Sequence, residues 1–393
     1  MKKTVYYSLC LLIYFITSCN FHQGKKNKVS FDYNGLIYIK CKINDSIEGN
    51  FIFDTGAYGL FLDSTFNVSR GLSNTILWFN PDSIRKSNLR FKFDTITYSP
   101  EIISTYDFKK IFGKDCDGVV GWDLFKNKIL EINYNDSCIN FIDSNYILHN
   151  DSFNKIPMVL KNQFFYVNTA VIPYKNIMIN GEWLFDTGYM GSLLLTNKIT
   201  DKYKIDSLNF EKFRASESFL DVTNYKSKGG IFRGKSIKLG KFLLTDPLIE
   251  YSIGRKVLFD SASYLGLMGN RTFEKFKMII DFKYHNLYLK ESSCYNEKSK
   301  FKTFGFGFID RTDICEGYII TSVLVDFEAA KAGIKSGDII THINGRSIKD
   351  YSKKEKKDIF KKVGEEFIFT IKRESNNFRF KLKLTEQLKD INN

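Results

Sequence analysis

The chain has 393 residues, of which 43% are hydrophobic and 16% aromatic, a composition that excludes intrinsic disorder and allows two or three domains with buried cores. Its formal net charge is +14, and either a nucleic-acid-binding surface or solubility with attraction to an anionic membrane would account for that excess. Because Lys is scattered over loops and tails, without an Arg-rich helix or a basic-aromatic stripe, we favour the second explanation and expect no nucleic-acid partner.

The first eighteen residues have the pattern of a secretory signal peptide. A basic start, Met1-Lys2-Lys3, precedes a mostly apolar run at 5–16 that is too short to span a bilayer comfortably. The end of this run, Ile16-Thr17-Ser18-Cys19, resembles the lipobox of bacterial lipoproteins. The resemblance implies cleavage before Cys19 and lipidation of its thiol; the alternative is an ordinary signal peptide with an incidental cysteine.

We therefore expect an exported protein, anchored by lipid to a bacterial membrane, with the periplasmic side of the outer membrane as its location. Residues 19–30 are polar and basic and are expected to form a tether. The cysteines expected in the mature domains are an odd number, so at least one has no partner within the chain: Cys41, Cys116, Cys138, Cys294 and Cys315. The four His and the absence of Cys-x-x-Cys give a zinc site no support, and we expect neither metal nor organic cofactor.

One short pattern occurs twice in the chain. GNFIFDTGA at 49–57 returns as GEWLFDTGY at 181–189, so in each copy an apolar strand runs directly into Asp-Thr-Gly. A carboxylate at the end of a buried strand must be paired, hydrogen-bonded or protonated. If the two copies belong to pseudo-symmetric halves, Asp54 and Asp186 meet at the interface and share one proton.

The first half, residues 31–150, reads as a series of strands around the first copy. We predict strands at 36–39 and 49–53 joined by a turn at 44–46, another at 60–63, and a closing hairpin at 129–134 and 138–142. A strand at 118–120 ends in Gly121, and a short helix with Asp123 as its cap follows. Gly56 permits a tight backbone turn, and the Thr55 hydroxyl is able to bond backbone across an interface.

The second half, residues 151–296, repeats these landmarks in the same order. We predict strands at 165–172, 181–185 and 193–196, a glycine-bounded segment from Gly266 to Gly269 that leads into a helix, and a closing hairpin at 278–281 and 286–290. The spacing from Asp to the second glycine is 121 − 54 = 67 in the first half and 269 − 186 = 83 in the second. We assign the additional residues to loops around 202–228.

This paired pattern over 31–296 resembles the retropepsin-like and pepsin-like aspartyl proteases. Asp-Thr-Gly also occurs in phosphate-transfer enzymes, but there it comes with a second acidic motif and an α/β context that are absent here. The resemblance implies a mainly β fold with two pseudo-symmetric lobes and Asp54 and Asp186 as the catalytic pair. It also implies supporting residues in the two loops and in the ψ-shaped loops beneath them: Thr55, Gly56, Thr187, Gly188, Gly118, Gly121, Gly266 and Gly269.

The sequence departs from the family at Tyr189, where a small residue such as Ala57 is usual. Tyr189 is compatible with a narrowed cleft, with part of a subsite, or with a lobe that has lost activity. The family also implies a flap over the cleft, for which residues 77–79, 95–98 and 229–232 are candidates. These apolar segments are equally compatible with core strands.

The last part of the chain, residues 297–389, looks like a PDZ domain, an α+β fold. The match runs through FGFGF at 304–308, GYIITSV at 317–323 and AAKAGIKSGDIITHING at 329–345. It implies that Phe306, Gly307 and Phe308 form a loop whose N–H groups bind a peptide C-terminus, with a helix at 353–362 as the other wall of the groove. The alternative is a PDZ fold that only clamps the protease. His342 is expected to be structural.

Taken together, the sequence predicts an exported aspartic-type endopeptidase that acts on peptide or protein substrates through a water activated by the two aspartates. A degenerate, peptide-binding envelope lipoprotein is the alternative that Tyr189 favours. A structural envelope protein is a third interpretation, supported only by the anchor.

Overall fold

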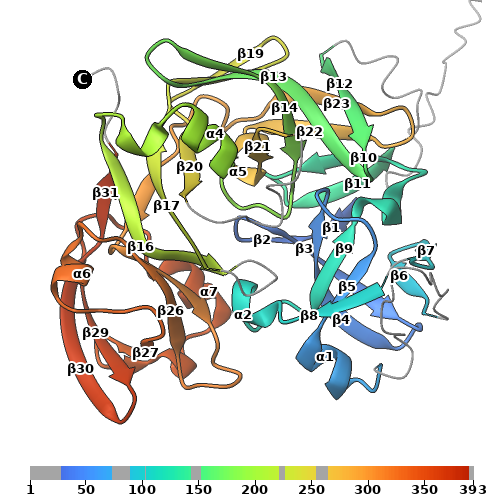
Figure 1. The fold of residues 1–393 in the computed structure, drawn as a ribbon. Helices are drawn as coiled ribbons and strands as arrows, with labels where there is room; N and C mark the ends of the chain where they lie inside the picture. Colours follow the sequence, from blue (N-terminus) through green and yellow to red (C-terminus); the bar gives the residue numbers. More distant parts are fainter. Residues whose placement is uncertain are drawn as a thin grey trace, which may run out of the picture.

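The computed structural model describes residues 28–72, 89–101, 103–142, 152–220, 226–253 and 264–388. Over these residues the fold is mainly β, with two β lobes followed by a smaller C-terminal unit (Figure 1). The predicted signal peptide, Cys19, most of the tether and the flap candidate 77–79 lie outside the described residues. Within the described part, no helix is long and apolar enough to cross a membrane.

Lobe 1 is built on one sheet with the strand order β7-β6-β3-β4-β9-β5-β8, and β2 pairs with β3. Its strands are β2 (Asp32–Tyr33), β3 (Ile37–Ile43), β4 (Ile47–Asp54), β5 (Leu60–Asp63), β6 (Phe91–Phe93), β7 (Ile96–Tyr98), β8 (Ile103–Tyr106) and β9 (Gly118–Gly121). The β3–β4 turn has positive φ at Asn44 and Asp45, as tight hairpin turns require. Short helices α1 (Ser64–Ser69), α2 (Lys109–Phe112) and η1 (Trp122–Phe125) follow β5, β8 and β9.

Lobe 2 repeats the central topology of lobe 1. Its strands are β13 (Phe164–Tyr174), β14 (Ile177–Phe185), β15 (Leu193–Leu195), β16 (Lys212–Leu220), β17 (Lys226–Arg233), β18 (Ser236–Leu239), β19 (Phe242–Thr245), β20 (Leu248–Ile253) and β21 (Gly266–Met268). The parallel pairs β4·β9 and β5·β8 of lobe 1 correspond to β14·β21 and β15·β20, and antiparallel β5·β9 corresponds to β15·β21. The duplication inferred from the motifs is therefore a duplication of strand pairing. Lobe 2 also contains α4 (Asn197–Lys202), η2 (Ile205–Ser207) and α5 (Asn270–Phe273).

Two local predictions were wrong. The described part of region 202–228 is not mainly loop: it holds η2, all of β16 and the start of β17, and β16 pairs with β17 as a hairpin. Asp123 does not cap a helix from outside. It lies within the 3₁₀ turn η1, whose N-cap is Gly121 without a side-chain bond, and its carboxylate instead accepts the Gly59 N–H at 2.8 Å.

The predicted closing hairpins do not close each lobe separately. They are β10 (Ile129–Asn133) with β11 (Cys138–Ile142), and β22 (Phe276–Asp281) with β23 (Asn286–Glu291). β10 pairs with β22, β1 (Lys28–Ser30) extends one side and β12 (Asn154–Lys161) the other. The order β1-β11-β10-β22-β23-β12 is thus one layer shared by both lobes, and one apolar core extends through it.

The C-terminal unit has its own apolar core, made of buried residues between Phe304 and Leu384. Its main sheet has the order β25-β26-β27-β29-β30. The strands are β24 (Phe301–Thr303), β25 (Phe306–Asp310), β26 (Tyr318–Val323), β27 (Ile339–Ile343), β28 (Arg346–Ser347), β29 (Glu366–Arg373), β30 (Asn376–Lys383) and β31 (Thr385–Gln387). The helices are α6 (Glu328–Lys331), η3 (Ile348–Asp350) and α7 (Lys353–Asp358), the last shorter than the predicted helix at 353–362.

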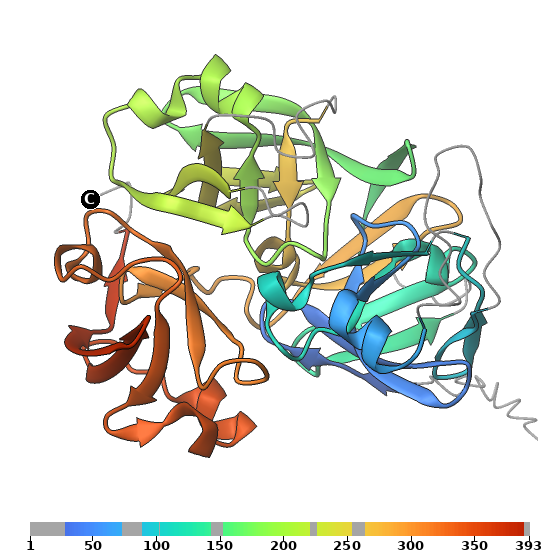
Figure 2. The same cartoon turned by 60° about the horizontal axis from the view of Figure 1, so that its bottom comes forward.

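The C-terminal unit lies against both lobes (Figure 2). On lobe 2, the β16 backbone pairs with it, since Ala215 forms a bridge with Leu324 and Val325 donates its N–H to the Arg214 carbonyl at 3.0 Å. The buried Arg233 guanidinium donates to the carbonyls of Asp246, Ser299 and Leu388. On lobe 1, the α2 region reaches β25. The unit is therefore held by backbone contacts to two different lobes.

Candidate active site

Strand alternation decides which face carries the two aspartates. Phe51 and Phe53 of β4 are fully buried in the shared core, so Ile52 and Asp54 face the other side of the sheet. In lobe 2, Trp183 and Phe185 enter the core, and Leu184 faces the other way. A buried apolar strand thus delivers each Asp-Thr-Gly at its end, away from the core.

The Asp54 and Asp186 carboxyl groups lie close enough to interact directly across the lobe interface. Each also accepts the N–H of the glycine in its own loop, Gly56 at 2.7 Å and Gly188 at 2.8 Å. Each glycine is packed by the aspartate of the other lobe: a Cβ on Gly56 would lie 2.8 Å from Asp186 Cγ, and one on Gly188 would lie 2.4 Å from Asp54 Cγ. The structure brings the two aspartates together as expected. Both loops need glycine because a Cβ at either position would collide with the opposite aspartate.

The environment of the pair favours a retained proton. Burial raises the pKa of Asp54, against hydrogen bonds from Asp186 and the loop N–H groups that lower it. Burial also raises the pKa of Asp186, well above its usual range, and the neighbouring Asp54 charge adds to the effect. Two carboxyl groups this close cannot both ionise without repulsion in a poorly solvated site, so the pair is set up to hold one proton between them.

Thr55 and Thr187 connect the two loops across the lobe interface. The Thr55 hydroxyl donates to the Phe185 carbonyl at 2.8 Å and accepts the Thr187 N–H at 3.0 Å. The Thr187 hydroxyl does the same with the Phe53 carbonyl, at 2.9 Å, and the Thr55 N–H, at 3.0 Å. Both threonines are fully buried, so these four bonds satisfy groups that water does not reach. The predicted bracing is present as a symmetric set of bonds.

The predicted glycines beneath the loops lie where another backbone passes too close for a side chain. A Cβ on Gly118 would lie 2.2 Å from the Phe61 carbonyl oxygen, and one on Gly121 2.5 Å from that of Ala57. In lobe 2, a Cβ on Gly266 would lie 2.0 Å from the Leu194 carbonyl oxygen. Gly269 meets the Tyr189 carbonyl oxygen at 2.4 Å in the same way. These glycines allow β9 and β21 to pack against the chain that follows each Asp-Thr-Gly.

The Tyr189 side chain packs within lobe 2. Its hydroxyl lies beside Gly191 and the Glu250 carboxylate, and its ring packs with the apolar cluster of Tyr166, Leu184 and Leu267. Burial and the nearby Glu250 raise the pKa of the Tyr189 hydroxyl well above its usual range, so it stays neutral. The departure from a small residue is therefore accommodated in the wall of lobe 2, while Asp186 keeps its bond to the Gly188 N–H.

Sequence reasoning missed two residues that follow the second glycine of each copy. Asn270 of lobe 2 donates to the Thr187 carbonyl at 2.6 Å and to the Gly35 carbonyl of lobe 1 at 2.9 Å. Trp122 of lobe 1 donates its Nε1–H to the Gln163 carbonyl of lobe 2 at 2.9 Å. Their equivalent places in the repeat were a visible signal, but the sequence does not show that each reaches into the opposite lobe.

Asp123 supports the first loop rather than a helix. Its carboxylate bonds the Gly59 N–H, and the Tyr98 hydroxyl donates to its other oxygen. Burial raises the pKa of Asp123 to about 6, against the lowering effect of the Gly59 bond. The flap candidate 95–98 includes this Tyr98 in sheet strand β7, and candidate 229–232 lies within β17 with Phe232 fully buried, so both are sheet strands.

Apolar walls flank the carboxyl pair on the aspartate faces of both sheets. In lobe 1, Ile52 and Val119 cluster with Leu36 and Tyr38, and Phe108 and Phe112 from the α2 region pack on them. In lobe 2, Leu184 and Leu267 form the corresponding cluster. Most of these side chains are buried, so they keep water away from the sheet face on which the aspartates lie.

In the C-terminal unit, the three predicted loop residues begin β25. Gly305, with φ +91, makes the turn that precedes them, and Phe306 is buried in the core while Gly307 and Phe308 are half-buried. Phe308 meets Phe360, just beyond α7, at a ring distance of 5.7 Å. His342 of β27 lies beside the Thr341 hydroxyl, at 3.0 Å. Residues 306–308 therefore form the start of a strand rather than a loop, and this strand lies beside the segment that follows α7.

The cysteines Cys41, Cys116, Cys138, Cys294 and Cys315 are all free thiols. Among the described residues, no group of three or more His, Cys, Asp or Glu side chains is placed to hold a metal ion.

Comparison with known proteins identifies one part of the chain. A family model described as PDZ domain matches residues 303–384. No curated protein sequence matches the chain. An aspartic proteinase from Irpex lacteus is a structural neighbour with a TM-score of 0.45 and 11% identity, covering 70% of this chain and 99% of that one. The C-terminal unit is thus a PDZ domain, whereas the interpretation of the two lobes rests on the geometry described above.

Proposed function

We propose that the protein is an aspartic-type endopeptidase with a PDZ domain that binds peptide C-termini. The observation that carries this proposal is the close approach of the Asp54 and Asp186 carboxyl groups, each packed against the glycine of the other loop and braced from both lobes. The two aspartates come from two copies of one motif; Asp186 is buried and Asp54 is half-buried.

In this mechanism one water lies between the two carboxyl groups. The ionised member takes a proton from the water as general base, and the protonated member donates a hydrogen bond to the scissile carbonyl oxygen. The water oxygen bonds to the carbonyl carbon, the base passes the proton that it took from the water to the amide nitrogen, and the C–N bond breaks to release the amine and the carboxylic acid. Braced loops matter here because the base and the acid must stay within hydrogen-bond reach of one water, about 2.6–3.2 Å.

The test is cleavage of a quenched-fluorescent unfolded protein by the wild type and by Asp54→Asn and Asp186→Asn. Each variant is expected to lose cleavage entirely while keeping its fold, because the amide has nearly the same shape but supplies neither base nor acid. Asp94→Asn is the matched control, since Asp94 is exposed and has a positive φ that Asn tolerates. Undiminished cleavage by either dyad variant would sink the proposal.

The second candidate is a peptide-binding envelope lipoprotein without cleavage. The match of residues 303–384 to the PDZ family favours it, because that match concerns binding alone. It predicts peptide binding by the wild type and both Asn variants alike, with no product formed by any of them. For location we propose an exported protein anchored through lipidated Cys19, on the pattern at 16–19.

A further inference from the structure

A peptide would add to the PDZ domain as a strand along the open edge of β25. The Arg311 N–H donates to the Gly317 carbonyl, so Arg311 and, two residues earlier, Ile309 direct their backbone groups toward β26. By the alternation of an antiparallel pair, Phe308 and Asp310 direct theirs toward the open edge. These two residues therefore offer the N–H and C=O groups that a ligand strand would use.

Part of this edge is already occupied by lobe 1. The Lys114 N–H, just after α2, donates to the Asp310 carbonyl at 2.8 Å. Gly113 packs on the same peptide group, where a Cβ would lie 3.1 Å from the Asp310 carbonyl oxygen, and its φ of +89 also favours glycine. Lobe 1 thus makes the kind of backbone bond that an added strand would make.

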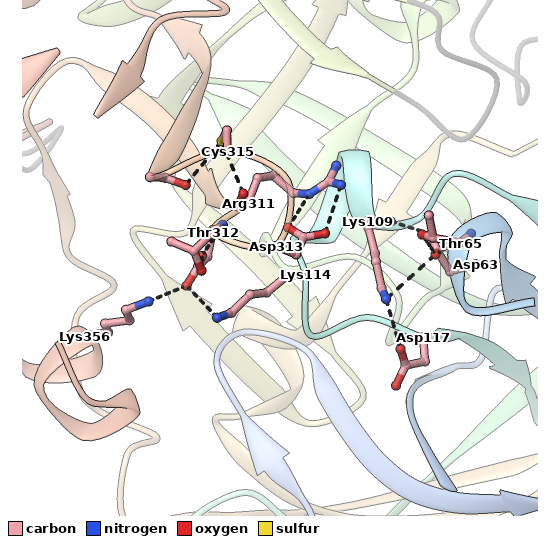
Figure 3. A network of polar contacts seen from close by, with 12 residues as sticks. Asp63, Thr65, Lys109, Lys114, Asp117, Arg311, Thr312, Asp313, Cys315 and Lys356 are labelled. Atoms are coloured by element: carbon pink, nitrogen blue, oxygen red, sulfur yellow. Dashed lines mark hydrogen bonds and ion pairs between the residues drawn. The ribbon is translucent and has the colours of Figure 1, made fainter. Parts of the chain in front are cut away.

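Charged side chains hold this contact from both sides (Figure 3). The Asp310 carboxylate lies 2.8 Å from Lys356 Nζ of α7 and 3.9 Å from Lys114 Nζ of lobe 1. Although burial opposes its charge, hydrogen bonds from Lys356 and Thr312 lower the pKa of Asp310. Lys353 at the start of α7 also pairs with Asp32 of lobe 1 at 2.7 Å. Asp310 is therefore ionised and links both walls of the groove to lobe 1.

The pairing register places a ligand against this contact. With its carboxylate on the N–H groups of residues 306–308, a ligand antiparallel to β25 pairs its last residue with Phe308. Two residues earlier, its third-from-last residue pairs with Asp310. The N–H of that residue would need the Asp310 carbonyl, which the Lys114 N–H already occupies.

We propose that the β25 edge is a surface with two competing partners: residues 113–114 of lobe 1, and a peptide of three or more residues with a free C-terminal carboxylate and an apolar last side chain. The apolar preference comes from the aromatic floor, where Phe308 contacts both Phe306 and Phe360. This inference rests on the proposed peptide binding by the PDZ domain. A ligand of that length displaces the lobe 1 segment.

Displacement acts on a segment that leads back to the candidate active site. Lys109 of α2 donates its N–H to Asp63 and places its Nζ 3.3 Å from Asp117 (Figure 3). Asp117 immediately precedes β9, and Gly121 at the end of β9 pairs with Asp54. Occupancy of the PDZ groove and the setting of the first Asp-Thr-Gly loop are therefore connected through a short, contiguous stretch of lobe 1.

The test uses the full chain and dye-labelled hexapeptides with a free carboxylate and Val, Leu or Phe as last residue, beside the same peptides with a C-terminal amide. Lys114→Pro removes the competing N–H and is expected to raise affinity for the free-acid peptides about five- to ten-fold. Lys114→Ala, which keeps the N–H and loses only the partly exposed charge, is the matched control and is expected to change affinity less than two-fold.

Amide hydrogen exchange of the wild type gives a reading that does not depend on a variant folding. The Lys114 amide is expected to be protected in the free protein and to exchange at least ten-fold faster when free-acid peptide saturates the chain. Binding that leaves this protection unchanged, or an affinity for Lys114→Pro equal to that of the wild type, overturns the competition while peptide binding by the PDZ domain stands. Failure of every form to bind overturns both, and cleavage by the dyad is judged separately.

Discussion

The two threonines of the Asp-Thr-Gly loops have a larger structural role than their small side chains suggest. Each hydroxyl accepts one backbone N–H and donates to one backbone carbonyl of the other lobe, and all four partners are buried. The main role of Thr55 and Thr187 is to fix the distance between the two loops; their contribution to apolar burial is small. The geometry of the carboxyl pair depends on this distance.

We predict that Thr55→Val lowers the free energy of unfolding by roughly 2–5 kcal/mol, because the Thr187 N–H and the Phe185 carbonyl are left buried without their partner. Thr55→Ser keeps the hydroxyl and should cost much less. Chemical denaturation of both variants measures the difference. Equal stability of the Val and Ser variants would mean that these bonds contribute nothing net.

The carboxyl pair predicts a definite pH dependence of stability. Both pKa values are raised in the folded state, so the folded chain keeps a proton that the unfolded chain releases near its ordinary pKa of about 4. The pair's contribution to stability is thus fully present below about pH 4 and is lost as pH rises through the folded values. Cleavage should fall over the same rise, as the shared proton leaves.

For Asp186→Asn we therefore expect the melting temperature, relative to that of the wild type, to rise as pH increases from 4 to 8, because one ionisable group of the pair is gone. Thermal melts of both proteins across that range provide the measurement, with Asp94→Asn as control. A difference that stays constant with pH would contradict the raised pKa values.

At the scale of elements, the hairpin of β16 and β17 and the residue that ends it attach the PDZ domain to lobe 2. Phe213 of β16 meets Phe327 of the PDZ domain at a ring distance of 4.7 Å, and β16 continues its backbone pairing into Leu324. Arg233 ends β17 and bonds the carbonyls of segments on either side of the domain. This hairpin lies within the stretch from Asp186 to Gly269, the longer of the two spacings.

We predict that Arg233→Lys destabilises the junction by roughly 2–5 kcal/mol, because an ammonium cannot reach three carbonyls that the planar guanidinium bonds together. Limited proteolysis near residue 299 and thermal melts measure the destabilisation of this junction. Arg214→Lys is the matched control: its pair with Asp206 is half exposed, so an effect within about 0.5 kcal/mol is expected. A junction as resistant in Arg233→Lys as in the control would refute the assignment.

At the scale of the whole molecule, the two lobes share one core and one layer of strands, whereas the PDZ domain has a separate core and is attached by backbone bonds and ion pairs. The lobes are therefore expected to behave as one folding unit, and the PDZ domain as a second one docked on both lobes. A membrane anchor, if formed at Cys19, would hold this assembly through residues ahead of β1.

For the anchor we predict that Cys19→Ser moves the protein from the membrane fraction to the soluble fraction, because the thiol is the expected site of lipid attachment. Mass spectrometry of the wild type should find a mature chain that begins with a lipidated Cys19. An unmodified Cys19, or a different mature start, would show that the pattern at 16–19 is incidental.

The sequence by itself determined the positions of both aspartates, the threonines that brace them, the glycines beneath them and the PDZ domain. These are local properties: an apolar strand that ends in a carboxylate, and glycines where backbones must touch, leave their pattern in consecutive residues. The sequence was misleading where one local pattern is compatible with two structures. At Asp123 the Gly59 N–H, a donor distant in sequence, decides that the carboxylate supports a loop instead of capping a helix. In region 202–228 the pairing of β16 with β17 decides that the segment is a hairpin and not a loop.

Only the tertiary structure decided the contacts between distant segments. The pairing of β10 with β22, the reach of Asn270 to Gly35, and the Lys114 bond to Asp310 join residues far apart in the chain. Backbone groups make or accept most of these bonds, and every residue type except proline carries the same backbone N–H and C=O groups. Their partners are therefore set by how the lobes pack, which residue identity alone does not encode.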